Sequence, residues 1–205
     1  MSAPTIETAR RRRRRKVQSR RMSTPYKRNA TYADLEALPE NLKGEIIDGD
    51  LWAFPRPATG HAVVLREVTH RLDPVIDDDG PHGWIILADV EVRFGPHLLV
   101  PDIVGWRRER MPVLPDVNIV ELRPDWVCEG MSPSTARMDR GRKREIYAAG
   151  GVPHLWYVDP ANHTLDVLTL DGASYRVTAT AGGADRGNYA PFETIELDLA
   201  RFWRR

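Results

Sequence analysis

The stretch from Pro124 to Gly151 constrains the fold more than any other part of the sequence. It opens with the apolar run Trp126–Cys128, which follows a proline and is typical of a buried β-strand. Ser132–Thr135 then offers side-chain oxygens that can cap a helix, and a pair of glycines can end that helix. We therefore predict a strand, a turn and a helix, with Glu129 at the end of the strand and Lys143 on the helix.

Length and composition fit a single globular domain. The chain has 205 residues, of which 41% are hydrophobic and 29% are charged, and this is enough to bury one core. The single cysteine rules out an internal disulfide and fits a reducing compartment. No apolar run approaches the length of a membrane span. We therefore expect a cytoplasmic protein without membrane segments, with a basic tail over residues 1–22 and one domain over residues 23–205.

Charge is distributed unevenly along the chain. Residues 10–21 hold nine basic side chains, and Glu7 is the one acid among the first 21 residues. Residues 22–205 therefore carry 21 basic and 28 acidic side chains, a net charge of −7. The basic run has no hydrophobic periodicity, so we predict a disordered tail. Its role is open between a nucleic-acid arm, a solvated tail and an extension upstream of a true start at Met22.

Hydrophobic periodicity predicts a mixture of helices and strands in the rest of the chain. The expected helices cover residues 31–38 and 59–76, and Pro74 is expected to bend or end the second. The expected strands cover residues 45–47, 50–54, 84–94, 98–106, 155–158, 164–170 and 175–180, with hairpin turns at Asp48-Gly49, Gly95-Pro96 and Asp171-Gly172. This set of elements predicts an α/β (α+β) domain in which helices cover a sheet.

Several common catalytic chemistries find no support in the sequence. The six histidines show no metal-ligand spacing, and a single cysteine cannot form a zinc cluster. Gly130-Met131-Ser132 begins like a serine nucleophile elbow, but Ser134 stands where the second glycine belongs. Cys128 lies within an apolar strand, and we interpret it as a packed core thiol.

Two carboxylates and a lysine remain as candidate catalytic groups. Asp102 follows a proline inside an apolar run, where burying a carboxylate is costly unless it binds a cation or a donor. Glu129 ends the adjacent apolar strand, and Lys143 lies on the helix that follows. Carboxylates at strand ends can hold Mg²⁺ and leave positions for water and a phosphate oxygen, while a lysine can offset charge on phosphorus. An ordinary surface ion pair is the alternative interpretation.

At these residues the sequence resembles the Uma-type family of restriction endonucleases, a branch of the PD-(D/E)xK nuclease superfamily. The resemblance rests on Pro101-Asp102, Glu129-x-Met131-Ser132-Pro133-Ser134-Thr135, Arg140, Lys143, Tyr147 and Gly151-Val152-x-x-x-Trp156-x-Val158-Asp159-Pro160. It extends from Tyr32 to Trp203 and includes Glu45-x-x-Asp48-Gly49 and His61.

The resemblance implies a restriction endonuclease-like mixed β-sheet flanked by helices. It also implies that Asp102 and Glu129 hold Mg²⁺ or Mn²⁺ and that the protein hydrolyses phosphodiester bonds in DNA. The superfamily usually places its lysine two residues after the acid, where this chain has Met131. Lys143 is the residue that matches the lysine of the Uma-type branch, and its role requires the helix to fold back over the strand end.

The resemblance suggests further site residues with alternative interpretations. Arg140 and Arg142 are possible substitutes for the lysine. Glu45 is a candidate catalytic residue, as an auxiliary acid near the metal, and its alternative is an ordinary surface acid on a strand. His61, at the start of a predicted helix, is read as structural or substrate-facing rather than catalytic.

Three functions therefore stay open. The first is a DNA endonuclease that depends on Mg²⁺ or Mn²⁺. The second is a catalytically weak or inactive nuclease-fold domain that binds nucleic acid or protein, which the acidic body favours because phosphate neutralisation drives nonspecific DNA affinity. The third is a homodimeric structural or regulatory domain whose acids are merely paired. The joint presence of Asp102, Glu129 and Lys143 argues against the third, since a core needs no such trio.

Overall fold

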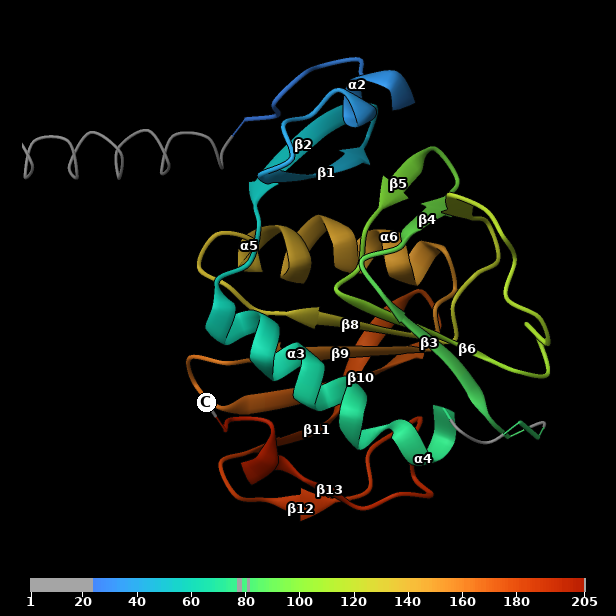
Figure 1. Cartoon of the computed structure of the whole chain (residues 1–205), viewed down its shortest axis with the longest axis vertical. Helices are drawn as coiled ribbons and strands as arrows, with labels where there is room; N and C mark the ends of the chain where they lie inside the picture. Colours follow the sequence, from blue (N-terminus) through green and yellow to red (C-terminus); the bar gives the residue numbers. More distant parts are fainter. Residues whose placement is uncertain (1–23, 77–78, 81, 205) are drawn as a thin grey trace, which may run out of the picture. The chain divides into compact units, whose positions relative to one another are not determined.

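The computed structural model describes residues 24–76, 79–80 and 82–204 (Figure 1). The chain divides into two compact units after Arg56. The predicted basic tail of residues 1–22 lies outside the described residues. Among the helices of the described part, none is both long and apolar enough to span a membrane.

The described part of the N-terminal unit, residues 24–56, contains a hairpin and a short helix. The hairpin is formed by β1 (Leu42–Ile47) and β2 (Asp50–Pro55), as predicted. Its turn residues Asp48 and Gly49 have φ values of 54° and 79°, which a type I′ turn requires. The predicted helix is α2 (Tyr32–Glu36), and a capping box closes its first turn.

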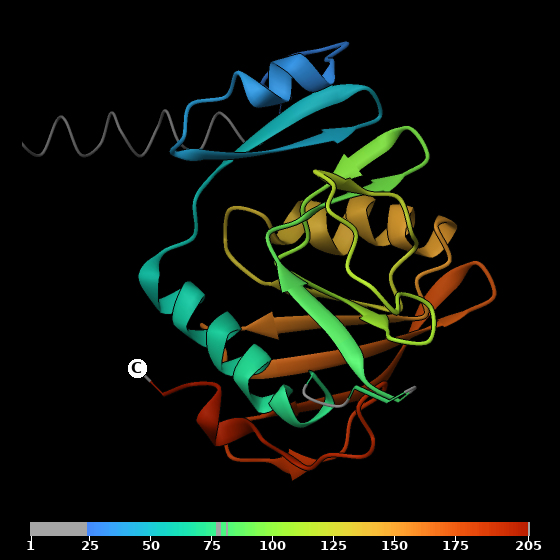
Figure 2. The same cartoon turned by 45° about the vertical axis from the view of Figure 1, so that its right-hand side comes forward.

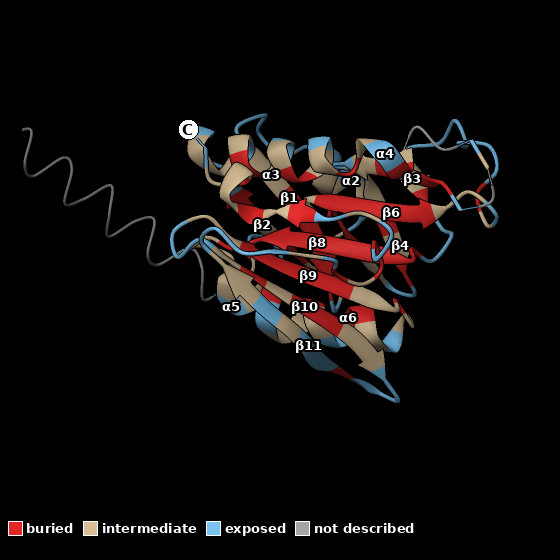
Figure 3. Cartoon of the chain, turned by 90° about the horizontal axis from the view of Figure 1, so that it is seen from below, coloured by how far each residue is buried: buried red, intermediate tan, exposed pale blue. Residues whose placement is uncertain are grey.

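The C-terminal unit is built on a mixed six-stranded sheet with the order β11-β10-β9-β8-β6-β3. Its strands are β3 (Trp84–Ala88), β6 (Ile103–Arg107), β8 (Trp126–Gly130), β9 (His154–Asp159), β10 (Thr164–Asp171) and β11 (Ser174–Gly182). The central strands β8 and β9 are parallel, and the other neighbouring pairs are antiparallel. All five residues of β8 are buried, as Figure 3 shows, so the strand predicted at 126–128 lies at the centre of the domain.

Helices cover both faces of this sheet (Figures 1 and 2). One face carries α3 (Thr59–Arg71) and α4 (Asp73–Ile76), which together replace the predicted bent helix and meet beside Pro74. The other carries α5 (Ala136–Met138), a π-helical turn (Asp139–Lys143) and α6 (Arg144–Ala149). Because side chains alternate along a strand, β8 directs Cys128 toward α3 and Glu129 toward α6.

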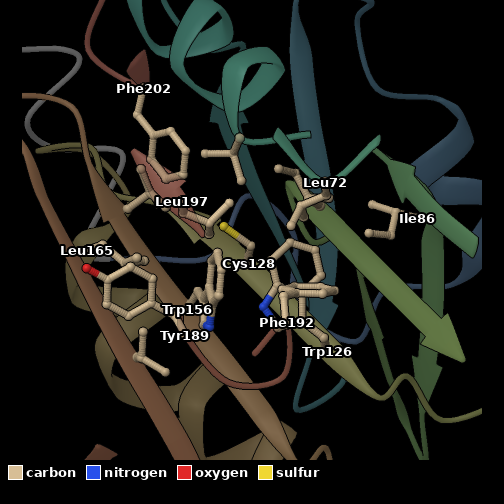
Figure 4. Close-up of a cluster of buried hydrophobic side chains, with 14 of the residues drawn as sticks. Leu72, Ile86, Trp126, Cys128, Trp156, Leu165, Tyr189, Phe192, Leu197 and Phe202 are labelled. Atoms are coloured by element: carbon tan, nitrogen blue, oxygen red, sulfur yellow. The ribbon is translucent and has the colours of Figure 1, made fainter. Parts of the chain in front are cut away.

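A buried hydrophobic cluster lies on the α3 face and includes Phe192 and three tryptophans (Figure 4). Phe192 packs against Trp84, Trp126 and Trp156, with ring centroids 4.9, 4.9 and 5.4 Å apart. The apolar C-terminal segment supplies Phe192 and also Phe202, which is fully buried. This segment contains β12 (Arg186–Gly187), β13 (Leu197–Asp198) and a 3₁₀ turn (Leu199–Arg201), which the sequence did not predict as separate elements.

Two of the predicted strands are each broken in two, and the prediction of continuous strands was wrong. The strand expected over residues 84–94 stops at Ala88 and resumes as β4 (Glu91–Phe94). The break falls at Asp89, whose φ of 54° lies in the left-handed region. The strand expected over residues 98–106 is likewise split into β5 (His97–Leu99) and β6.

The two breaks lie next to each other, so the two neighbouring chain segments change direction at the same place. β3 pairs with β6, whereas β4 pairs with β5 across the predicted Gly95-Pro96 turn and with β7 (Ile119–Val120) on its other side. At the bend the Asp89 amide donates to the Asp102 carbonyl at 3.4 Å. Pro101 has no N–H to continue a ladder. Asp102 therefore lies in the link just before β6 and not inside a strand.

The last hairpin is displaced by one residue from its predicted position. Asp171 pairs with Ser174, so the turn residues are Gly172 and Ala173. Gly172 has a φ of 60°, a conformation that glycine adopts without steric cost.

The aromatic cluster generates a stability prediction. We expect Phe192→Ala to destabilise the protein by about 3–5 kcal/mol, because it leaves a cavity among three tryptophan rings. Urea unfolding followed by tryptophan fluorescence measures the change. Val177→Ala on β11 is the matched control, since Val177 is 52% exposed, and it should change stability by less than about 0.5 kcal/mol. Equal effects of the two substitutions would contradict this packing.

Candidate active site

A buried ion pair joins the central strand to the helix that follows it. The Lys143 Nζ lies 2.6 Å from the Glu129 Oε1, and the two side chains are 5% and 3% exposed. The predicted folding of the helix back over the strand end is therefore present. Removing two charges from water is expensive, so such a pair persists only when further hydrogen bonds support it.

Two more groups on the same helical face support this pair. The Tyr147 hydroxyl donates to the same Glu129 oxygen at 2.5 Å. The Asp139 Oδ1 lies 3.4 Å from the Lys143 Nζ. Residues four apart share a helical face, so the 139, 143 and 147 positions point together toward β8. The cluster holds two carboxylates and one ammonium group, which leaves an excess of negative charge.

The helix reaches this position through a wide turn. Asp139–Lys143 is π-helical, and Gly141 within it has φ −103° and ψ −105°, outside the helical region. The Tyr157 hydroxyl donates to the Asp139 carbonyl at 2.9 Å and ties the turn to β9. Burial, followed by the nearby Glu129 carboxylate, raises the pKa of Tyr157 well above its usual value, so this hydroxyl remains a donor. Single π turns inside helices are common at functional sites.

Asp102, in the link just before β6, is held against the end of β8. Ile103 pairs with Cys128, and extending this antiparallel register by one residue sets Asp102 opposite Glu129. The Gly130 amide donates to the Asp102 Oδ2 at 2.9 Å. The predicted need of this carboxylate for a donor is therefore met by the backbone next to Glu129.

His61 approaches the same carboxylate from the first turn of α3. Its Nε2 lies 3.6 Å from the Asp102 Oδ2, and the two side chains are 11% and 13% exposed. Among the described residues this nitrogen has no hydrogen-bond partner, although it is buried. The imidazole lies directly over Gly130, where an added Cβ would come 2.4 Å from Nε2 and 2.5 Å from Cε1.

The other predicted candidates lie elsewhere. Arg140 bonds Asp166 at 3.1 Å, and Arg142 bonds Glu145 at 3.0 Å. The cation that lies 2.6 Å from the Glu129 carboxylate is Lys143. Glu45 lies on β1 in the N-terminal unit, so its part in the site stays a prediction.

Cys128 is the packed thiol that the sequence predicts. Its side chain is fully buried in the aromatic cluster. Burial, reinforced by the charges of Asp102 and Glu129, raises its pKa well above the usual value, which makes it a poor nucleophile.

Two side chains of the site, Asp139 and Tyr147, were not predicted as site residues, although Tyr147 belongs to the motif that carries the resemblance. The available signal was their spacing of four residues on either side of Lys143, which places polar groups on a helical face that also carries buried Ile146. Because the π turn changes the angular spacing locally, this signal is weaker than in a regular helix.

The donor set of the site suits a hard divalent cation. Asp102 and Glu129 offer carboxylate oxygens, and Mg²⁺ commonly binds through one or two carboxylates together with substrate phosphates. In the part of the chain that the structure describes, no three or more acidic, histidine or cysteine side chains are grouped to hold a metal. The fit therefore rests on two carboxylates and not on a complete protein cage.

Known proteins resemble this chain in sequence and in fold. The Uma2 family, described as "Putative restriction endonuclease", matches residues 30–200. A crystal structure from Anabaena variabilis ATCC 29413, described as "a putative nuclease belonging to DUF820", has a TM-score of 0.70 and 22% sequence identity. The similarity covers 85% of this chain and 97% of the other, and it confirms the predicted fold. No curated protein matches the sequence.

The buried ion pair predicts a strong coupling between its two members. Lys143→Met should cost about 3–5 kcal/mol of stability, because it leaves the Glu129 charge buried without its cation. Adding Glu129→Gln should recover a large part of this loss. Urea unfolding of the wild type, both single variants and the double variant measures the coupling.

The control for this cycle is an exposed ion pair. Arg176→Met removes one member of the Arg176–Asp171 pair, whose side chains are 69% and 71% exposed. It should cost less than about 1 kcal/mol. Purely additive effects of the Lys143 and Glu129 substitutions would show that the two side chains do not form a buried pair.

Proposed function

We propose, from the premise that this chain belongs to the Uma2 family of restriction endonuclease-like proteins, that it is a metal-dependent endonuclease acting on DNA. Asp102 and Glu129 would hold Mg²⁺ or Mn²⁺, and Lys143 would assist hydrolysis. The observation that carries the proposal is the buried contact of 2.6 Å between Lys143 and Glu129, next to Asp102, which lies just before β6 and accepts from the Gly130 amide. Burying Glu129 and Lys143 next to the partly buried Asp102 is costly, and the proposed chemistry gives these groups a use.

The metal would polarise the scissile phosphate and make a water molecule more acidic. Water then adds to phosphorus while the bond to one ester oxygen breaks, which leaves a phosphate monoester and a free hydroxyl group. Tyr147 fixes the orientation of the Glu129 carboxylate through its hydrogen bond at 2.5 Å. The ammonium group of Lys143, which contacts Glu129 and Asp139, would offset the negative charge that develops on the phosphate oxygens.

A second candidate function is a nuclease-fold domain that binds nucleic acid or protein with little or no catalysis. It is favoured by the net charge of −7 over residues 22–205, which opposes tight nonspecific DNA binding. It is also favoured by the Glu129 carboxylate being held by Lys143 and Tyr147. The two functions differ in one result, since only the nuclease cuts DNA when metal is added.

The acid ligands give the direct test of the proposed nuclease. Wild-type protein should cleave supercoiled plasmid with Mg²⁺ or Mn²⁺ and not with a chelator. Asp102→Asn and Glu129→Gln should each lower the rate at least about a hundredfold, as loss of a transition-state electrostatic group does. Both should also lose the rise in melting temperature that metal binding gives the wild type.

Matched controls separate this result from general damage. Asp116→Asn and Glu109→Gln make the same chemical changes at exposed positions, and both should retain activity and the metal-dependent rise. Wild-type cleavage rates in either site variant, measured on preparations free of contaminating nuclease, would exclude the assigned metal ligands.

The arginine-rich tail bears on how the protein meets DNA. If the nine cations of residues 10–21 contact phosphates, the log–log plot of affinity against salt should have a slope as steep as about −8. A chain starting at Met22 should show a flatter slope and a higher KM with little change in kcat. Fluorescence anisotropy with a labelled duplex measures the slopes, and equal slopes for the two forms would show that the tail makes no phosphate contacts.

A further inference from the structure

We infer that His61 is a ligand of the same metal as Asp102 and that it turns the preference of the site from Mg²⁺ toward Mn²⁺. This inference rests on the proposed function, because it takes Asp102 as a metal ligand. It goes beyond that function by adding a nitrogen donor, which sets the identity of the ion.

The first observation is the state of the imidazole nitrogen. The His61 Nε2 is buried and has no hydrogen-bond partner among the described residues. Buried polar atoms in proteins nearly always have a partner, and an exception calls for a water molecule or an ion at that position. An imidazole nitrogen is among the commonest metal ligands in proteins.

The second observation is the separation of the two donors. The His61 Nε2 and the Asp102 Oδ2 are 3.6 Å apart, which is an ion-pair distance just beyond that of a hydrogen bond. Two ligands that each lie about 2.0–2.2 Å from one ion, and are not opposite each other, are separated by about 3–4 Å. The pair is thus spaced to share a cation.

The third observation is that the backbone leaves room for the ring. Residue 130 is a glycine, and any larger residue would place its Cβ 2.4 Å from the His61 Nε2. The Gly130 amide also donates to Asp102, so the same residue positions the carboxylate and admits the imidazole. Both ligands are therefore set by one backbone position that directly follows Glu129.

The chemistry of the donors decides which metal is favoured. Mg²⁺ prefers oxygen ligands and keeps much of its water, whereas imidazole suits first-row transition metals. One nitrogen beside carboxylates should therefore raise the affinity for Mn²⁺ relative to Mg²⁺. Of the two proposed ions, Mn²⁺ is the one that binds readily to a combination of nitrogen and oxygen ligands.

The test measures metal binding without DNA or turnover. The full chain is titrated with Mn²⁺, followed by electron paramagnetic resonance of the free ion, and with Mg²⁺, followed by calorimetry. His61→Ala should weaken Mn²⁺ binding at least about tenfold, the lower end of the loss seen when metal-site residues are removed. Mg²⁺ binding should change much less. His61→Asp should move the ratio of the two dissociation constants toward Mg²⁺.

A second variant keeps the imidazole and moves it. Gly130→Ala should displace the ring and weaken Mn²⁺ binding, whereas Gly60→Ala, with nothing within 4 Å of the added Cβ, should not. Circular dichroism confirms that each variant is folded. In His61→Asp the ratio of the two dissociation constants should shift in favour of Mg²⁺. Replacing a purely structural histidine would not produce this shift.

The possible outcomes separate the inference from the proposed function. If Asp102→Asn abolishes metal binding while His61→Ala and His61→Asp bind both ions like the wild type, the inference is overturned and the proposed metal site stands. If Asp102→Asn also leaves binding unchanged, the proposed site itself fails. A selective loss of Mn²⁺ affinity in His61→Ala and in Gly130→Ala supports the inference.

Discussion

The buried carboxylate of Glu129 is the constraint on which the rest of the C-terminal unit depends. Every residue of β8 is buried, so this charge cannot reach water and has to be compensated inside the protein. The helical segment that follows β8 packs on the sheet and places the Lys143 Nζ 2.6 Å from the Glu129 carboxylate. The wide turn at 139–143 and the hydrogen bonds of Tyr147 and Tyr157 fix the helix there.

The end of β8 connects two different environments. On one face of the sheet, Glu129 bonds Lys143 and Tyr147. The backbone of the next residue, Gly130, bonds Asp102, which faces His61 from α3. The bend at Asp89 and Pro101 keeps Asp102 out of β6, which begins at Ile103. The Asp102 carboxylate turns toward the Gly130 amide. The candidate site thus depends on strand ends and on a helix from each face.

The sequence predicted best what depends on neighbouring residues. The Asp48-Gly49 hairpin, the bend near Pro74 and the buried strand at 126–128 follow from local chemistry, and all three are present. The breaks in the strands over 84–94 and 98–106 could not be predicted in this way. Apolar residues recur along both runs despite Asp89 and Asp102, and what divides the runs is a change of pairing partner, since β3 pairs with β6 whereas β4 pairs with β5.

The site was predictable in its identities more than in its geometry. The resemblance pointed to Lys143, and the structure brings that residue to Glu129. The supporting positions of Asp139 and Tyr147 depend on a π turn, which has no strong sequence signal. The closeness of His61 to Asp102 is a tertiary contact across 41 residues, and it depends on the absence of a side chain at Gly130.

The assignment of Asp102 and Glu129 as metal ligands is tested by locating a bound metal ion. A crystal of the protein soaked in Mn²⁺ gives an anomalous signal that marks the ion without reference to activity. We expect one anomalous peak at the end of β8, within bonding distance of the carboxylates of Asp102 and Glu129. A peak elsewhere, or none at Mn²⁺ concentrations that saturate binding in solution, would contradict this assignment.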